Sequence, residues 1–338
     1  MREPPDISVL ILLYRGRGTI RGCLESLGAQ RGVKLEVLLL DNGCPENTGE
    51  WAGYWLARRE DDINWRLLER PRNIGFASGM NHLYAESSGR FVCFLNQDVT
   101  LAPDHLRLLY DGLLDHTDWA GACGTLYRGV KDESQRVLDT TGHVIFRDRI
   151  VRNRGGGRPL GASEEAPYPA GEVFGLSAAC ALYRRDALEQ AREEEGPFDP
   201  DFFAYFEDID LDYRIHRAGW KLGYIPEAVG WHTLAGSGAR RELYVRLRAY
   251  GNRRRILCKH ESLASLAPDL IPVLLQDTYA VLRALVTDPI ACLLGPWFFV
   301  FSLPRVLRRR RRMDRMWGAD RTWIRKWLRP ETERLVKY

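Results

Sequence analysis

The chain has 338 residues, more than the usual domain length of about 100–200, so we expect one large core with an appendage, or two domains. Hydrophobic residues make up 45% of the chain and charged residues 28%, a balance that excludes disorder over most of the length. The net charge of +4 is modest, and residues 305–312 alone contain six arginines. Such a run could bind nucleic acid, but the apolar segment beside it favours an anionic membrane surface as the partner.

The seven cysteines are scattered singly, without a Cys-x-x-Cys pair. Because no signal peptide precedes them, we expect reduced cysteines in a cytoplasmic protein, with neither zinc nor structural disulfides. Residues 7–14 (ISVLILLY) are better interpreted as a first buried strand than as the apolar core of a signal peptide.

Apolar runs alternate with helical patterns in the first 98 residues. Strands are predicted at residues 7–14, 35–42, 65–70 and 90–98, and helices at residues 19–30, 46–58 and 76–87. Continuous apolar runs indicate strands covered on both faces, so the sequence predicts an α/β fold with a mainly parallel sheet and right-handed crossovers. Ligands bind such sheets at the carboxyl ends of the strands. The side chains at these ends are Tyr14, Arg15, Asp41, Asn42, Asn96, Gln97 and Asp98.

The alternation stops after residue 126, which suggests three regions. Residues 1–128 form the first half, residues 129–238 an α+β half with a hairpin and a Gly-rich loop, and residues 239–338 a helical region broken by prolines. The uncharged stretch 289–304 has 16 residues and an internal Gly-Pro, short of the roughly 20 needed to span a bilayer. We expect an interfacial or re-entrant segment at the membrane, with a buried core helix as the alternative.

Asp98 ends the fourth strand and precedes a predicted turn at residues 99–103. A carboxylate at this place can meet a divalent ion bound to a diphosphate, and Mg²⁺ and Mn²⁺ prefer hard oxygen ligands. The alternative role is capping of the next helix, for which Thr100 and Asp104 are better placed.

A second acidic cluster opens a helix: Glu207, Asp208, Asp210 and Asp212 lie within six residues. Capping and the helix dipole account for one carboxylate there, and four exceed that requirement. The preceding aromatic residues can form an apolar wall that raises a carboxylate pKa toward that of a general base. These residues are Phe202, Phe203, Tyr205 and Phe206.

Three further motifs carry weaker signals. Residues 72–81 (RNIGFASGMN) allow backbone N–H groups to approach an anion, and Arg72 adds charge, although a plain strand-to-helix turn would look the same. Residues 15–19 (RGRGT) resemble a phosphate loop only superficially. His232 ends a short apolar run and is either a structural histidine or a ligand.

The order of these motifs makes the sequence similar to the family 2 glycosyltransferases of the GT-A fold, particularly bacterial rhamnosyltransferase-like members that build surface polysaccharide. The resemblance covers residues 7–255. It rests on Tyr14, Asp41-Asn42, RNIGFASGMN (72–81), LNQDV (95–99), FGLSAACALYRRDAL (174–188), FEDIDLDYR (206–214) and His232.

The resemblance implies a nucleotide-sugar donor, a catalytic base at Asp208, and Mg²⁺ or Mn²⁺ at Asp98 and His232. The site reads Asn96-Gln97-Asp98, so it offers one carboxylate where a D-x-D site offers two. Tyr250, Asn252 and Arg253 lie where relatives often carry a Tyr and an Arg-Asn pair. The residues implied around the donor are Tyr14, Asp41, Asn42, Arg72, Asn73, Gly75, Asn81, Asn96, Asp98, Glu207 and Arg253.

The expected activity is therefore inverting transfer of a sugar, L-rhamnose from dTDP-rhamnose or a hexose from a UDP-sugar, to a saccharide or polyprenyl-diphosphate-linked acceptor. The protein is expected on the inner face of the plasma membrane, without nucleic acid, and a homo-oligomer is left open. One alternative is a nucleotidyltransferase that makes nucleotide sugars, but RGRGT is not followed by the residues that this reaction requires. The other is a non-catalytic membrane-binding module.

Overall fold

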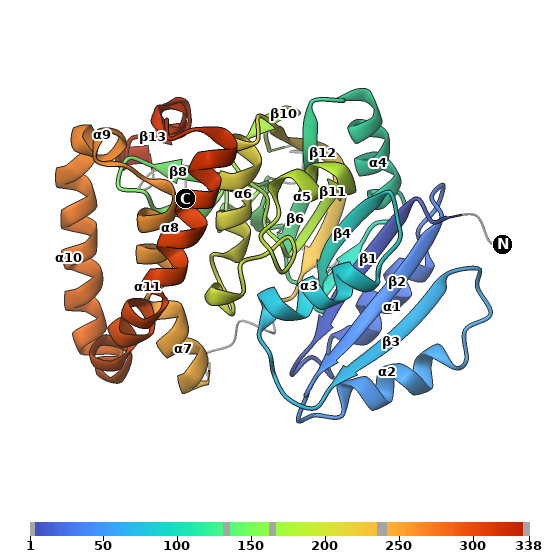
Figure 1. The fold of residues 1–338 in the computed structure, drawn as a ribbon. Coiled ribbons are helices and arrows are strands. Elements are labelled where there is room, and N and C mark those ends of the chain that lie inside the picture. Colours follow the sequence, from blue (N-terminus) through green and yellow to red (C-terminus); the bar gives the residue numbers. More distant parts are fainter. Residues whose placement is uncertain (1–3, 131–135, 162–166, 235–241, 334–338) are drawn as a thin grey trace.

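A computed structural model of the chain describes residues 4–130, 136–161, 167–234 and 242–333. Its centre is one mixed sheet, with the parallel strands β1, β2, β3 and β4 at one side and antiparallel pairs around β11 and β12 at the other (Figure 1). In spatial order the strands are β3 (Asn64–Arg70), β2 (Leu35–Asn42), β1 (Ile7–Leu13), β4 (Phe91–Asn96), β11 (Cys180–Arg184), β6 (Trp119–Arg128), β12 (Lys221–His232) and β10 (Gly171–Val173). The predicted α/β fold with a mixed, mainly parallel sheet is confirmed.

Helices cover both faces of the sheet, which explains the continuous apolar strands. On one side lie α1 (Ile20–Gly28), α2 (Thr48–Leu56) and α4 (His105–Asp115). On the other lie α3 (Phe76–Glu86), α5 (Arg185–Ala191) and α6 (Glu207–Arg217). Alternate residues of β1 enter the two cores, since Val9 packs on the first side and Leu10 on the second, and both are fully buried.

The predicted turn at residues 99–103 is wrong in its first half. Val99–Leu101 form a strand, β5, which pairs antiparallel with the end of β12. Val99 is buried completely and Leu101 almost so, and both pack in the first core. The turn residue Pro103 acts only after this strand, because pairing with a distant strand outweighs local turn preference.

The chain after residue 241 is helical and packs against the second half of the sheet domain. It contains α7 (Leu243–Tyr250), α8 (Asn252–His260), α9 (Leu263–Leu266), α10 (Leu270–Thr287) and α11 (Pro289–Trp317). A last strand, β13 (Leu328–Arg329), joins β8 (His143–Phe146) and β9 (Val151–Asn153) in a small second sheet. The main sheet also crosses the expected boundary at residue 128, because β7 (Leu138–Thr140) pairs with β6. The three-region division itself stays a prediction.

The prolines do not break the C-terminal helices as expected. Pro289 is the first residue of α11, where its missing N–H costs nothing, and α11 continues through Pro296 and Pro304 to Trp317. Packing of α11 along α7 and α8 compensates for the hydrogen bonds lost at the two inner prolines. Within the described part of the chain, two helical stretches could cross a membrane by length and composition alone, Leu263–Thr287 and Pro289–Trp317.

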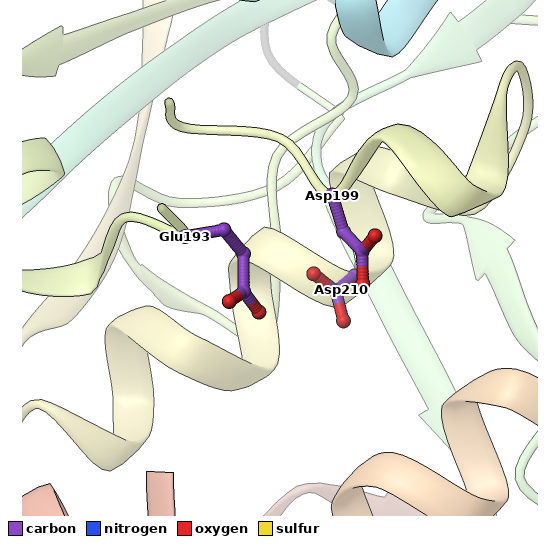
Figure 2. A group of neighbouring side chains, drawn as sticks. All are labelled: Glu193, Asp199 and Asp210. Carbon is purple, nitrogen blue, oxygen red and sulfur yellow. The ribbon is translucent and has the colours of Figure 1, made fainter. Parts of the chain in front are cut away.

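Three buried carboxylates converge beside α6: Glu193 follows α5, Asp199 precedes a 3-10 turn at Pro200–Phe202, and Asp210 lies on α6 (Figure 2). Their oxygens lie within 4.8 Å of one another, as metal ligands do. The cation that lies closest to all three is the ammonium of Lys259 on α8. Its Nζ lies 2.7 Å from Glu193 Oε1, 2.7 Å from Asp199 Oδ2 and 2.8 Å from Asp210 Oδ1.

The charges of this cluster support each other. Burial by itself would lower the pKa of Lys259, but the three carboxylates outweigh it and raise that pKa. Burial would raise the pKa of Asp210, yet Lys259 and Arg214 hold it well below its ordinary value. Arg214 Nε also lies 2.9 Å from Asp210 Oδ2. We therefore interpret this cluster as a structural ion pair that joins α6 to α8.

Replacing Lys259 with methionine should destabilise the protein by about 3–5 kcal/mol, because three buried carboxylates lose the ammonium that all of them share. The free energy of unfolding in urea measures this loss. Lys221→Met is the matched control, since Lys221 pairs with Asp118 and Glu172 on the surface, and its urea midpoint should stay near that of the wild type. Equal midpoints for the two variants would contradict the structural role of Lys259.

Candidate active site

A cavity of about 860 Å³ opens where β4 ends and α6 begins. The β4–β5 corner contributes Asn96, Gln97 and Asp98, and the first turn of α6 contributes Glu207 and Asp208. Among the other lining residues are Tyr14, Arg128, Asp139, His143, Arg152, Asn153, Tyr205, Phe206 and His232. The fold thus brings Asp98, Asp208 and His232, which are far apart in the sequence, to one cavity.

The pairing of β5 with β12 places His232 next to Asp98. In this antiparallel register His232 lies opposite Val99, the residue after Asp98, and Thr233 N–H donates to the Asp98 carbonyl oxygen at 3.0 Å. His232 Nε2 lies 3.2 Å from Asp98 Oδ1. On the other side of the ring, His232 Nδ1 lies 2.8 Å from Oδ2 of Asp139, which is the middle residue of β7.

Burial would lower the pKa of His232, but hydrogen bonds to Asp139 and Asp98 outweigh it and raise that pKa to about 9. The same geometry suits a divalent ion: ligands about 2.1 Å from an octahedral ion lie roughly 3 Å apart in neighbouring positions, close to the 3.2 Å between His232 and Asp98. Asp139 would then hold the Nδ1–H and orient the ring, a common arrangement for metal-bound histidine. Sequence reasoning missed Asp139, because no motif surrounds it.

Asp208 enters the cavity from the first turn of α6, where the helix dipole favours a carboxylate. Its Oδ1 accepts the Ile209 N–H at 2.8 Å, and its Oδ2 accepts the Ala178 N–H at 3.3 Å. Beside it, burial and the charge of Asp208 raise the pKa of Glu207 well above its ordinary value. Neighbouring carboxyl groups in such different surroundings can take different chemical roles.

The loop before α6 has strained backbone. Phe203, Tyr205 and Phe206 have φ values of 63°, 68° and 72°, a region that side chains with a Cβ rarely adopt. Asn252 on α8 holds this loop, because its Nδ2 donates to the carbonyls of Phe202, Ala204 and Tyr205 at 3.1, 3.1 and 2.7 Å. Strain that the surrounding structure maintains is typical of functional sites.

Only part of the expected aromatic wall reaches the cavity. Tyr205 and Phe206 line it. Phe202 instead packs in a separate core cluster. Phe203 lies against Gly75: a Cβ on Gly75, whose φ is +88°, would come within 2.5 Å of the Phe203 ring. Gly75 is therefore needed for close packing of this turn against the loop before α6.

A second cavity of about 670 Å³ lies at the ends of β2 and β3. Asp41 lines it, and its Oδ1 accepts the Cys44 N–H at 2.8 Å. The remaining lining residues are Gly43, Cys44, Asn47, Glu50, Glu69, Arg70 and Pro71. Arg72 follows them and is exposed. This cavity at the carboxyl ends of parallel strands is a suitable place for a nucleotide base.

Four of the residues expected to contact the donor make structural hydrogen bonds. Asn42 Nδ2 donates to Asn73 Oδ1 at 3.0 Å, and Asn42 Oδ1 accepts the Ile74 N–H at 3.0 Å, so this pair shapes the 72–75 turn. Asn81 is buried and binds both backbone groups of Phe198. Arg253 binds Asp277 on α10 and the carbonyls of residues 148 and 149, and it does not line the cavity.

Tyr14 lines the large cavity, and its backbone is held by Gln97. The Tyr14 N–H donates to Gln97 Oε1 at 3.2 Å, and Gln97 Nε2 donates to the Tyr14 carbonyl at 2.5 Å. The middle residue of Asn96-Gln97-Asp98 therefore joins the ends of β1 and β4 instead of offering a third ligand. The contacts of all these residues with a donor stay predictions.

Residues 8–192 match the model of the family described as glycosyl transferase family 2. The chain is 31% identical over 256 residues to the N-acetylglucosaminyl-diphospho-decaprenol L-rhamnosyltransferase of Mycobacterium tuberculosis, a match that covers 69% of this chain and 78% of that protein. It is 27% identical to an N-acetylglucosaminyltransferase of Mesorhizobium japonicum over 67% of this chain and 51% of that protein.

Two solved structures have the same fold at low sequence identity. The complex of GalNAc-T7 with UDP, GalNAc and Mn²⁺ has a TM-score of 0.56 and 13% identity, covering 76% of this chain and 48% of that one. The mannosyltransferase of Pyrobaculum calidifontis with GDP-Man and Mn²⁺ has a TM-score of 0.52 and 15% identity, covering 94% of this chain and 84% of that one. Together with the family match, they show that the chain belongs to glycosyltransferase family 2 and is a glycosyltransferase of the GT-A fold.

Proposed function

We propose that this glycosyltransferase transfers a sugar from a nucleoside-diphosphate donor with inversion, and that Asp208 is the catalytic base. The observation that carries this proposal is the single cavity lined by both Asp208 and the Asp98–His232 pair. A one-step displacement needs a base on the acceptor side and positive charge on the diphosphate side. Asp208 would take the proton of the acceptor hydroxyl as its oxygen attacks the anomeric carbon.

Asp98 and His232 would hold a Mg²⁺ or Mn²⁺ ion, with Asp139 orienting the histidine ring. When bound, the ion would supply positive charge for the diphosphate oxygens. The chain's own residues position the donor: Asp41 offers a carboxylate to the base at the smaller cavity, and Tyr14 and Asn96 line the larger one.

The donor and acceptor follow from the relative in Mycobacterium tuberculosis, whose name specifies L-rhamnose and an N-acetylglucosaminyl-diphospho-decaprenol acceptor. We propose L-rhamnose transfer from dTDP-rhamnose to a polyprenyl-diphosphate-linked saccharide in cell-surface polysaccharide synthesis. Hexose transfer from a UDP-sugar is the second candidate, favoured by the N-acetylglucosaminyltransferase relative.

The outer surface of α10 and α11 supports a peripheral place on a membrane, which we propose to be its cytoplasmic face. Only Val273 of α10 is buried, whereas Ile271 is 73% and Val286 84% exposed. Apolar residues spaced by three and four give α11 one exposed face, and the same spacing continues it into arginines. This face consists of Ile290, Leu293, Trp297, Phe301, Arg308, Arg311 and Arg315.

The arginines of residues 305–312 include some that bind carboxylates of the sheet domain and some that are exposed beside the apolar face of α11. Arg305 pairs with Asp201, and Arg309 pairs with Asp199 and Asp201, so these two arginines hold α11 to the sheet domain. Arg308 and Arg311 are exposed beside the apolar face. We therefore propose that the outward arginines meet anionic headgroups, while Arg305 and Arg309 bind carboxylates of the sheet domain.

Asp208→Asn should lower turnover by about 10²–10⁴-fold while donor affinity is kept, because a positioned base contributes about this factor and the amide keeps the shape. The control is Asp186→Asn in the first turn of α5. Asp186 accepts the N–H of the next residue as Asp208 does, but it lies outside the cavity. Steady-state release of nucleoside diphosphate measures both variants, and wild-type turnover in Asp208→Asn would refute the assignment.

A thermal-shift panel of dTDP-rhamnose, UDP-glucose and UDP-N-acetylglucosamine should select one donor, with a larger shift when Mg²⁺ or Mn²⁺ is present. A donor at about 100 times its Kd stabilises the protein by roughly 2.7 kcal/mol. Asp98→Asn should remove the part of the thermal shift that depends on metal, and Asp139→Asn should weaken metal affinity by about 10–100-fold. The exposed Asp118→Asn is the control. A donor shift that is independent of metal in the wild type would contradict the proposed ion site.

Replacing Arg308, Arg311 and Arg315 with glutamine should weaken binding to vesicles that contain phosphatidylglycerol by on the order of 10²-fold, since each arginine near the surface contributes about 1 kcal/mol. Vesicle sedimentation measures this change. The control replaces three exposed arginines of the opposite part of the molecule, Arg21, Arg31 and Arg58. Equal loss of binding in both triple variants would contradict a specific membrane face.

A further inference from the structure

A buried histidine and carboxylate lie directly behind Asp208. His143 on β8 and Asp212 on α6 are 5% and 0% exposed, and His143 Nδ1 lies 2.7 Å from Asp212 Oδ2. The other ring nitrogen, His143 Nε2, lies 3.8 Å from Asp208 Oδ2. The imidazole also lines the catalytic cavity. Asp212, His143 and Asp208 therefore form a row that ends at the cavity.

The surrounding chain is shaped to hold this pair. The backbone N–H of His143 donates to the Gly175 carbonyl at 2.7 Å, and the backbone N–H of Leu176 donates to Asp212 Oδ1 at 3.0 Å. A Cβ on Gly175 would come within 1.9 Å of Asp212 Oδ2 and 2.9 Å of His143 Nδ1. Glycine at position 175 thus leaves the space that the pair occupies.

The charges around His143 favour its protonated form. The ionisable groups that face the ring are Asp208 and Asp212 from α6. The residue opposite His143 on β9 is Asn153, which carries no charge, and the residue opposite it in the 175–178 loop is Gly175, which offers only backbone groups. Burial would lower the pKa of His143, but Asp212 and Asp208 outweigh it and raise that pKa. Burial raises the pKa of Asp212 to about 7, against the opposing effect of His143.

A second histidine shows that this arrangement is not the default for the fold. His216 lies one turn after Asp212 on α6, is partly buried, and its Nε2 lies 2.7 Å from the Phe174 carbonyl oxygen. Burial lowers the pKa of His216 to about 4, so it stays neutral. His143 and His216 thus differ in their partners: the ring of His143 faces Asp208 and Asp212, whereas the ring of His216 faces a backbone carbonyl.

Building on the proposed role of Asp208 as the base, we propose that His143 is a positioning residue, oriented by Asp212, that holds the Asp208 carboxylate in place for attack. His143 Nε2 lies 3.8 Å from Asp208 Oδ2, so a protonated ring would present its Nε2–H to this carboxylate. As the acceptor oxygen bonds to the anomeric carbon and the carbon–phosphate-oxygen bond breaks, the hydroxyl proton goes to Asp208, and His143 keeps its own proton. The same imidazolium stays beside Asp208 throughout the transfer.

The variants that test this are His143→Leu, Asp212→Asn and Gly175→Ala, with His216→Gln as the matched control. The three should lower kcat by about 10–100-fold and leave the donor KM near wild type, because they displace the base and not the donor. His143→Gln should restore part of the rate, since its amide can donate to Asp208. The donor is the one selected by the thermal-shift panel, and His216→Gln should keep wild-type kcat.

The protonation of His143 gives a readout that a packing role would not change. In ¹⁵N-histidine NMR spectra of the full chain, with the His143 signal identified by its loss in His143→Leu, the ring should stay protonated above pH 6.5. Its titration midpoint should fall in Asp212→Asn, because the raised pKa depends on that carboxylate. The rate should decline as pH rises through this midpoint, so the alkaline limb of the kcat profile should move to lower pH in the same variant.

Two outcomes separate this inference from the proposed function. Full turnover in Asp208→Asn would overturn the base and the inference with it. An inactive Asp208→Asn together with wild-type kcat in Asp212→Asn and His143→Leu would overturn only the positioning role. A neutral His143 at pH 6.5 in the NMR spectra would also overturn it, whatever the donor.

Discussion

The ion pairs of the buried Lys259 ammonium are the interactions on which the part of the molecule around α6 depends. The ammonium joins Glu193, Asp199 and Asp210, and through them it connects the segment after α5, the turn before α6 and α6 itself to α8. Removing one partner of such a buried set leaves the remaining charges less well compensated, so the elements are strongly held in one arrangement. Asp208 and Asp212 lie on the same helix as Asp210, and their positions follow from this anchor.

The site itself is assembled by strand pairing. Asp98 and His232 are separated by more than a hundred residues, and the antiparallel contact of β5 with β12 places them 3.2 Å apart. Each proposed functional carboxylate has its own histidine: Asp98 faces His232, which Asp139 orients, and Asp208 faces His143, which Asp212 orients. The two histidines therefore occupy similar electrostatic positions but serve different proposed roles, one beside an ion and one beside a base.

The C-terminal region both holds the loop before α6 in place and carries an exposed apolar and basic face. Its α8 holds the strained loop before α6 through Asn252, and β13 extends the small sheet that contains His143. Its arginines are divided by helix geometry, because residues on opposite faces of α11 meet different surroundings: Arg309 meets buried carboxylates, while Arg311 is exposed. The same helix stabilises the part of the molecule that contains α6, and in the proposed membrane association it would also present a surface to lipid.

The sequence by itself determined the features that depend on local pattern. Continuous apolar runs identified β1, β2, β3 and β4, and the ordered motifs identified the family and placed Asp98 and Asp208 at element ends. Only the tertiary structure decided which distant groups meet. Asp139, His143 and Lys259 carry no local signal, since their roles arise from partners far along the chain, and β5 forms because β12 lies beside it. The arginine run shows the same limit: its composition indicates positive charge, but only packing decides which arginines face carboxylates.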